Sequence, residues 1–334
     1  MTGMKGTDLV GLFTEHLRLC NVKKGEVVLA FTDAQFAFPE YPGAMMAAAT
    51  SLGAEVFTIT APSDAEISAQ LVLDAWKSAD MVVAMTSIPW LYTDAHNEAL
   101  ASGTRTLMVH EPVANLKRMF PNEDVIRRTY AGAKRMAEAS EIRVTDSAGS
   151  DFTLRKDGRK GHAQVGLADA PGRWDHWPAG LVATGPLEDT AQGTYIVRAG
   201  DVILQQRRHT VSEIRMTLEK GLITSIEGGL DAQLLRDYLS SFDDPDAFRF
   251  AHAGWGTEHR ALWNVVGMDS ESLYGTVMVS PGRNIFNAAH EHSGLGGTNY
   301  TRAHIDLCCR HKNLYLDGEL IVNEDEEIVP EYLR

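Results

Sequence analysis

The segment EVVLAF, residues 26–31, decides the fold class of the first part of the chain. It is a short, mostly apolar run that follows a Lys-Lys-Gly turn. Similar apolar runs follow at residues 56–59, 81–85 and 106–109. Strands that are apolar on both faces and separated by helices are typical of a parallel sheet covered on each side. The sequence therefore predicts a Rossmann-like α/β domain over residues 1–140, with a doubly wound, mostly parallel sheet.

The segments between these runs have the spacing and end signals of helices. The predicted helices cover residues 42–52, 64–77 and 94–102, and a longer helix, 123–140, ends the first domain. No Gly-x-Gly-x-x-Gly follows the first strand and no Gly-Lys-Ser/Thr loop occurs, so a nucleotide cofactor is not expected. We expect the sheet to be a scaffold whose loops contribute to a site shared with the second domain.

From Ile142 onward the pattern changes to polar–apolar alternation with frequent glycines. Residues 214–218 alternate before a Lys-Gly turn, and the segment 314–322 contains an Asp-Gly turn. Both patterns are typical of β-hairpins, and residues 231–240 have the pattern of an isolated amphipathic helix. The second domain, residues 141–334, is therefore expected to be a strand-rich α+β domain.

The composition narrows the range of partners. The chain has 334 residues and a formal net charge of −14, whereas nucleic acids and anionic membranes are bound by clustered Lys and Arg. We expect neither as a partner, and a small molecule instead. No segment is long and apolar enough to cross a bilayer, and no cleavable signal pattern occurs. Cys20, Cys308 and Cys309 are an odd count with two adjacent members, which favours reduced thiols and a cytoplasmic location.

The sharpest chemical signal is the pair His304 and Asp306. Residues two apart on a strand project from the same face, so an imidazole and a carboxylate would point together as metal ligands. A glycine-rich turn, residues 294–299, precedes this strand and either lets backbone approach a ligand or simply closes a hairpin. His252 would complete two histidines and one carboxylate, the facial arrangement of non-haem Fe(II) oxygenases. The simpler interpretations are a chance polar pair and a buried core histidine.

Four motifs, taken in order, resemble one metalloprotein superfamily. They are Trp174-Asp175-His176-Trp177-Pro178, His252-Ala253-Gly254-Trp255-Gly256, Gly275-Thr276-Val277 and the segment from Gly296 to Asp306. This superfamily contains aminopeptidase T-like metallopeptidases and the 2,5-dihydroxypyridine 5,6-dioxygenases of nicotinic acid degradation. The resemblance covers most of the chain and is strongest in its second half.

The two branches of this superfamily differ at their metal ligands. The peptidases hold two metals, and their pattern has glutamates where this chain has Leu181 and His252 and a histidine where it has Met278. Leucine cannot bind a metal, and a thioether is a poor ligand for a hard divalent ion, so the second metal site is missing. The remaining set, His252, His304 and Asp306, resembles the iron triad of the dioxygenases.

His259 is the rival of His252 for the third ligand position, since it follows seven residues later. We prefer His252 because its spacing and the Gly-Trp-Gly that follows match the dioxygenase pattern. The neighbouring Glu258 is then expected to orient a ligand imidazole.

The resemblance also indicates which residues act on the substrate. His96 follows the third apolar run, at the edge where open α/β sheets place functional loops, and would shuttle a proton. The alternative is a histidine on a helix surface. His176 would hydrogen-bond a ring hydroxyl while Trp174 stacks on the ring, although packing alone explains tryptophan there as well. Further candidates for substrate binding are Arg283, His292 and Tyr300, with His290, Glu291 and Asn299 beside them.

As a member of the dioxygenase branch, the protein would use Fe(II) to insert both atoms of O2 into a hydroxylated pyridine. The leading substrate is 2,5-dihydroxypyridine, which would give N-formylmaleamic acid; the sequence leaves the ring substituents open. The resemblance further implies a homo-oligomer. One alternative is an aminopeptidase T-like or other hydrolase that uses zinc, manganese or cobalt on the same ligands. Another is a non-catalytic binding protein on this scaffold.

Overall fold

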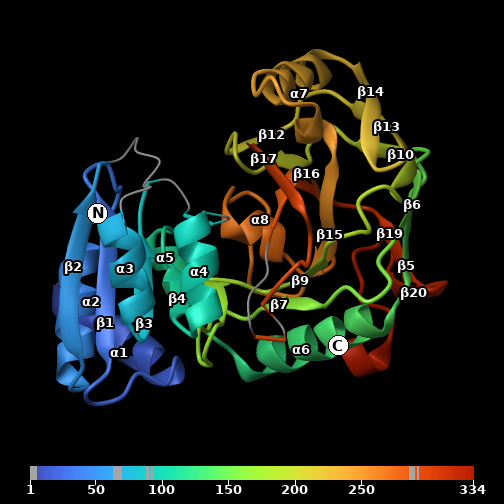
Figure 1. Ribbon diagram of the computed structural model, residues 1–334. Coiled ribbons are helices and arrows are strands. Elements are labelled where there is room, and N and C mark those ends of the chain that lie inside the picture. The colour runs from blue at the N-terminus through green and yellow to red at the C-terminus, as the bar shows by residue number, and fades with distance from the viewer. Residues whose placement is uncertain (1–5, 63–69, 88–89, 92, 286–289, 292) are drawn as a thin grey trace. The chain divides into compact units, whose positions relative to one another are not determined.

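The apolar runs of the N-terminal part form one parallel sheet. The computed structural model describes residues 6–62, 70–87, 90–91, 93–285, 290–291 and 293–334. Four strands of the sheet are the predicted runs, namely β1 (Val27–Asp33), β2 (Glu55–Ala61), β3 (Met81–Met85) and β4 (Arg105–Met108). All pair in parallel in the order β2-β1-β3-β4-β8, in which the fifth strand, β8, is Trp174–His176 (Figure 1). The predicted parallel sheet is therefore confirmed.

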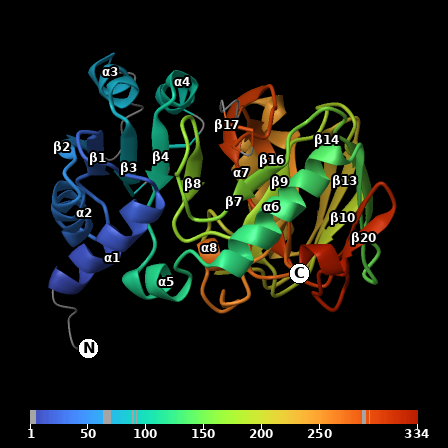
Figure 2. The ribbon, with the colours of Figure 1, turned by 90° about the horizontal axis from the view of Figure 1, so that it is seen from below.

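Helices cover both faces of this sheet. They are α1 (Gly6–Leu19), α2 (Glu40–Ser51), α3 (Gln70–Ser78), α4 (Asp94–Ser102) and α5 (Val113–Arg118). Figure 2 shows α3 and α4 on one face and α1 and α2 on the other, which is the doubly wound arrangement. The expected helix start at residue 64 lies outside the described residues. On the α3 face, the Phe31 ring meets Trp76 and Trp90 edge-on, with centroids 5.1 and 4.7 Å apart, and each such pair contributes about 0.5–1.5 kcal/mol beyond area burial.

The chain divides into two compact units whose boundaries differ from the expected break after residue 140. As far as the residues are described, the first unit comprises Met1–Asn122, Gln164–Ala179 and Asn287–Ser293. The second comprises Glu123–Ala163, Gly180–Phe286 and Gly294–Arg334. The chain thus returns to the first sheet to supply β8 after it has begun the second unit.

The long helix α6 (Glu123–Glu138), which was expected to end the first domain, belongs to the second unit. Its packing explains this. A Cβ on Gly132 would lie 2.8 Å from a methyl of Val182 and 2.9 Å from the ring of Trp255. Glycine at this position therefore lets α6 lie directly against strands of the second unit.

Two strand-rich sheets build the second unit. Their orders are β14-β13-β10-β6-β5-β19-β20 and β12-β11-β18-β16-β15-β9-β7, and β17 also pairs with β16. Their strands are β5 (Glu141–Thr145), β6 (Asp151–Arg155), β7 (His162–Gln164), β9 (Leu181–Thr184), β10 (Gln192–Val197), β11 (Val202–Ile203), β12 (Arg208–His209), β13 (Ile214–Glu219), β14 (Leu222–Gly228), β15 (Phe250–Gly256), β16 (Val277–Asn284), β17 (Asn299–His304), β18 (Leu307–Cys309), β19 (Asn313–Leu316) and β20 (Glu319–Val322). The shorter elements are the helices α7 (Leu230–Ser240) and α8 (Met268–Ser272) and the 3-10 turns η1 (Pro245–Phe248) and η2 (Glu331–Leu333). The strand-rich character predicted for this part is confirmed.

The two predicted hairpins are present. Strands β13 and β14 meet at Lys220 and Gly221, whose φ angles are 48° and 78°. Strands β19 and β20 meet at Asp317 and Gly318, with φ angles of 49° and 85°. Two-residue loops with both φ angles positive match the twist of the flanking strands, which is why Lys-Gly and Asp-Gly occur there.

Among the described helices, none is long and apolar enough to cross a membrane. The three cysteines are buried free thiols. Burial raises the pKa of Cys20 to about 12, which keeps this thiol protonated and unreactive.

Candidate metal centre

Strand β16 aligns the residues of the candidate metal centre. His252 on β15 pairs with Ser280, and Gly282 pairs with His304 on β17. The part of β16 that precedes Ser280 pairs with β18 instead, and Asp306 lies in the break between β17 and β18. The expectation of one continuous strand carrying both ligands is therefore wrong. Strand β17 ends at His304, and the change of pairing along β16 brings the carboxylate beside the imidazole.

Three donor atoms converge at this point. Nε2 of His252 and Nε2 of His304 each lie 3.3 Å from Oδ1 of Asp306. The two Nε2 atoms are 3.4 Å apart. His252 and Asp306 are buried, whereas His304 is partly exposed. The structure thus brings together the three residues that were predicted as ligands.

The donor set fits a divalent transition metal. First-row ions lie about 2.0–2.2 Å from imidazole nitrogen and carboxylate oxygen, so donors at neighbouring positions are about 3 Å apart and donors at opposite positions about 4 Å. All three separations here are 3.3–3.4 Å. The donors therefore match one face of a coordination sphere and leave the other face to further ligands, as in the two-histidine, one-carboxylate arrangement.

Every hydrogen-bonding atom of Asp306 has a partner. Ser280 Oγ donates to Oδ1. Gln205 Nε2 donates to Oδ2 at 2.6 Å, and Gln205 Oε1 accepts from the Asp306 backbone N at 2.6 Å. Leu204 N donates to the Asp306 carbonyl oxygen at 3.0 Å. Sequence reasoning missed Ser280 and Gln205 because they lie 26 and 101 residues from Asp306 and carry no motif.

The ring of His304 is oriented by backbone. Its Nδ1 donates to the carbonyl oxygen of Arg283 at 3.1 Å, which leaves the lone pair of Nε2 for a metal. On the same residue, the carbonyl oxygen accepts from the hydroxyl of Tyr238 at 3.2 Å. For His252, the buried Nδ1 has no hydrogen-bond partner among the described residues.

The electrostatics of the cluster favour the forms that bind metal. Burial lowers the pKa of His252, and the neighbouring Asp306 offsets part of that effect. Burial alone would raise the pKa of Asp306, but the charges and hydrogen bonds of His304 and His252 hold it well below its usual range. A neutral His252 and an ionised Asp306 are the states that ligate a cation without first losing a proton.

Gly282 allows β16 and β17 to approach each other at His304. Its φ is +106°, and a Cβ there would lie 2.2 Å from the carbonyl oxygen of Ala303 and 3.0 Å from Cα of His304. Both the backbone conformation and the contact require glycine.

The glycine-rich turn before β17 packs against protein. A Cβ on Gly297 would lie 2.0 Å from Cγ of Asn284, so the turn lies directly on that side chain. Asn299, at the start of β17, donates from Nδ2 to the carbonyl oxygens of Asp246 and Gly282 at 2.9 and 2.7 Å. These contacts place the turn against Asn284 and fix the start of β17.

His259 is not part of the cluster. Its side chain is 47% exposed, and its Nδ1 lies 3.9 Å from Glu258 Oε1. The Glu258 carboxylate accepts from the backbone N, Nε and Nη2 of Arg260 at 2.8, 2.9 and 2.6 Å. The expectation that Glu258 orients a ligand imidazole is therefore wrong, because its described hydrogen bonds go to Arg260.

Leu181 and Met278 occupy the positions at which the peptidase pattern has ligands. Leu181 lies in β9 and Met278 in β16, and both are buried. Neither side chain offers a donor for a second hard metal ion.

His96 lies in the first unit, in the first turn of α4. The Thr93 hydroxyl caps this helix by accepting from the His96 backbone N at 3.2 Å. The imidazole is fully buried, and its Nε2 is 2.8 Å from Oγ1 of Thr106 on β4. Burial lowers the pKa of His96 to about 3. The alternative of a histidine on a helix surface is therefore wrong.

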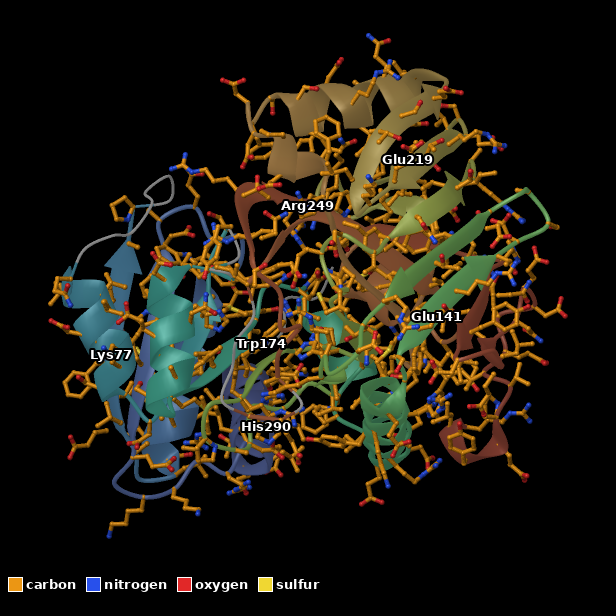
Figure 3. All side chains as sticks on the ribbon, turned by 45° about the vertical axis from the view of Figure 1, so that its right-hand side comes forward. Lys77, Glu141, Trp174, Glu219, Arg249 and His290 are labelled. Atoms are coloured by element: carbon orange, nitrogen blue, oxygen red, sulfur yellow. The ribbon has the colours of Figure 1, made fainter. Side chains whose placement is uncertain are left out.

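Trp174 and His176 lie beside His96 in the same unit. Both are on β8 (Figure 3 labels Trp174), and their side chains are buried. The Trp174 ring centroid is 6.1 Å from that of His96 and 5.4 Å from that of His176. His110, which sequence reasoning did not select, lies 5.2 Å from the His176 ring. The sequence signal for His110 was its place directly after the fourth parallel strand.

The remaining predicted substrate residues differ in their exposure to solvent. Arg283 donates from Nη1 to the carbonyl oxygen of Tyr300 at 3.5 Å, and the Tyr300 side chain is largely solvent-exposed. His290 is half-buried and Glu291 is exposed. His292 lies outside the described residues.

The fold and the three donors define a class of protein, namely α/β proteins with a candidate two-histidine, one-carboxylate metal centre. The family described as 2,5-dihydroxypyridine 5,6-dioxygenase matches residues 8–328. A curated protein of that name from Pseudomonas putida KT2440 is 32% identical to this chain, and the match covers 99% of each chain. The chain therefore belongs to the 2,5-dihydroxypyridine 5,6-dioxygenase family.

Solved structures agree with this assignment. The structure of 2,5-dihydroxypyridine dioxygenase from Pseudomonas putida KT2440 matches with a TM-score of 0.89 at 32% identity, over 99% of this chain and 100% of that one. Wild-type AmpT from Thermus thermophilus matches with a TM-score of 0.60 at 13% identity, over 97% and 99% of the two chains. The second match shows a shared fold alone, whereas the first agrees with the dioxygenase resemblance found in the sequence.

Proposed function

We propose that the protein is an Fe(II)-dependent dioxygenase that cleaves the ring of 2,5-dihydroxypyridine and adds both atoms of O2, with N-formylmaleamic acid as product. The observation that carries this proposal is the convergence of His252, His304 and Asp306 in a chain of this family. Bound Fe(II) would lower the pKa of a coordinated ring hydroxyl and supply the redox chemistry that O2 needs.

The charge of the cluster suits a hydroxylated ring. Imidazoles ligate a metal in their neutral form, so two imidazoles and one carboxylate around a divalent ion would leave the site with a net positive charge. A ring that has lost a hydroxyl proton is an anion and would be attracted to it. The three protein donors occupy one face, which leaves the other face for the ring and O2.

His96 is proposed to accept the hydroxyl proton of the substrate and to return it as the ring opens. Burial keeps its imidazole neutral, which is the form that accepts a proton. The contact of its Nε2 with the Thr106 hydroxyl fixes the ring. A base with so low a pKa suits only an acidified hydroxyl, as expected for one bound to a cation.

The substrate ring is proposed to stack on Trp174 and to hydrogen-bond His176, since both lie beside His96. Arg283, Tyr300 and His292 are proposed to bind the substrate as well. The family resemblance also supports a homo-oligomer, which light scattering of the purified protein would show.

The test is O2 uptake by anaerobically Fe(II)-loaded protein with 2,5-dihydroxypyridine, followed together with loss of the ring's ultraviolet absorbance. We expect stoichiometric uptake, and incorporation of both labelled atoms when ¹⁸O2 is supplied. His304→Ala should abolish uptake, whereas His259→Ala, a histidine outside the cluster, should retain it. No uptake, together with peptide or amide hydrolysis by zinc-, manganese- or cobalt-loaded protein, would replace the dioxygenase with a hydrolase.

A further inference from the structure

Gln205 reaches Asp306 from the turn that joins β11 and β12. Its side-chain amide makes two hydrogen bonds of 2.6 Å, one with the Asp306 backbone N and one with Oδ2. The adjacent Leu204 adds a third bond from the same turn, to the carbonyl oxygen of Asp306. Gln205 is itself an exposed residue, so its contact with Asp306 is not a by-product of core packing.

Asp306 needs this support because it lies outside the ladder of the sheet. Between β17 and β18 its N–H and C=O have no strand partner, and polar backbone groups that are buried need one. The turn supplies partners for both groups. It therefore makes the break between the two strands stable, and the break is what carries the carboxylate to the two histidines.

The same turn decides which carboxylate oxygen is available. The amide N–H of Gln205 engages Oδ2, whereas Oδ1 faces Nε2 of both His252 and His304. A carboxylate can bind a cation through one oxygen or through two. A donor held on Oδ2 opposes the rotation that would bring both oxygens to the ion.

We propose that Gln205 is a positioning residue that keeps Asp306 a one-oxygen ligand of the metal. The inference rests on the proposed function, because it presupposes a metal on the triad. A one-oxygen carboxylate uses a single coordination position, which preserves the open face for substrate and O2. Without the amide, Oδ2 becomes free to turn toward the ion and occupy a further position.

The experiment uses Co(II) as the probe, because its visible absorption reports coordination number. Metal-free protein is titrated with Co(II) in the wild type, in Gln205→Met and in Gln206→Met. Gln205→Met removes both hydrogen bonds at similar side-chain length. The matched control alters the next residue of the same turn, where Gln206 Oε1 accepts from Arg208 Nε at 3.0 Å. We expect Gln205→Met to weaken Co(II) binding about 10- to 100-fold and to change the spectrum, and Gln206→Met to do neither.

A second variant, Gln205→Glu, keeps an acceptor for the Asp306 backbone N but removes the donor to Oδ2. It should change the spectrum as Gln205→Met does, and it decides the question if Gln205→Met does not fold. Unchanged affinity and spectrum in both variants would overturn the inference while the proposed function stands. Failure of the wild type to bind one equivalent of Co(II), or wild-type binding by Asp306→Asn, would instead overturn the proposed function.

Discussion

Gly282→Ala tests whether the close approach of β16 and β17 places His304. An alanine at a φ of +106° is strained by about 1–3 kcal/mol. The new Cβ would also lie 2.2 Å from the carbonyl oxygen of Ala303, and such contacts essentially never fall below 3.0 Å. The strands must therefore separate by about 0.8 Å, and a misplacement of about 1 Å can cost about 100-fold in rate. We therefore expect the turnover rate of the Fe(II)-loaded Gly282→Ala variant to fall about 100-fold.

The assay combines O2 uptake, metal content and thermal unfolding, with Gly318→Ala as the control. Gly318 has a φ of +85° in the β19–β20 turn, and a Cβ there would meet no atom within 4 Å. The control therefore has the same kind of backbone strain, but its new Cβ contacts no other atom. It should lose stability and keep its activity. If Gly282→Ala binds iron and turns over as the control does, the close approach is not what places His304.

The burial of His96 and the hydrogen bonds of Asp306 can be tested by stability and metal-binding measurements. Burial lowers the pKa of His96 from 6.5 to about 3, so the unfolded chain binds the extra proton and stability is lost as pH falls from 6.5 toward 3. His96→Gln should flatten that loss, which amounts to about 1.4 kcal/mol per pKa unit, in urea titrations across this range. Ser280→Ala removes a donor from Asp306 Oδ1 and should weaken Co(II) binding about 10-fold, as measured by calorimetry; an unchanged affinity would show that Gln205 alone suffices. Saturating metal at about 100 times its Kd should stabilise the protein by about 2.7 kcal/mol, and Asp306→Asn should show no such rise in Tm.

Local pattern was enough to predict the parallel sheet and both hairpins. The strand around Val28 and Leu29 is apolar on both faces, and the Lys220-Gly221 turn requires two positive φ angles that few other pairs adopt. These features depend on residues close together in the chain. The triad could be predicted for another reason, because the resemblance supplied the pairing of His252 with a site 52 residues further on.

What the sequence did not reveal depends on distant contacts. Gln205 reaches Asp306 across 101 residues, and an exposed glutamine in a turn has no pattern that distinguishes it. The assignment of residues 164–179 to the first unit was missed because three strand residues, Trp174–His176, are too short for a periodicity. His259 stayed a rival of His252 in the sequence because spacing alone does not tell which side chain near the end of a strand is exposed to solvent.

Because β8 lies far behind β4 in the sequence, the parallel sheet cannot be completed early in translation. Thr106 N donates to Arg173 O, and Trp177 N donates to Met108 O, so in the described part of the chain the outer edge of β4 pairs with the segment that contains β8. Trp174 follows Met108 by 66 residues, which a ribosome adding about 5–20 residues per second translates in about 3–13 s. During those seconds the edge of the nascent sheet presents unpaired backbone N–H and C=O groups to neighbouring chains. A fragment cut after residue 140 would keep that edge permanently and should precipitate or recruit chaperones unless the 164–179 segment is supplied as a peptide.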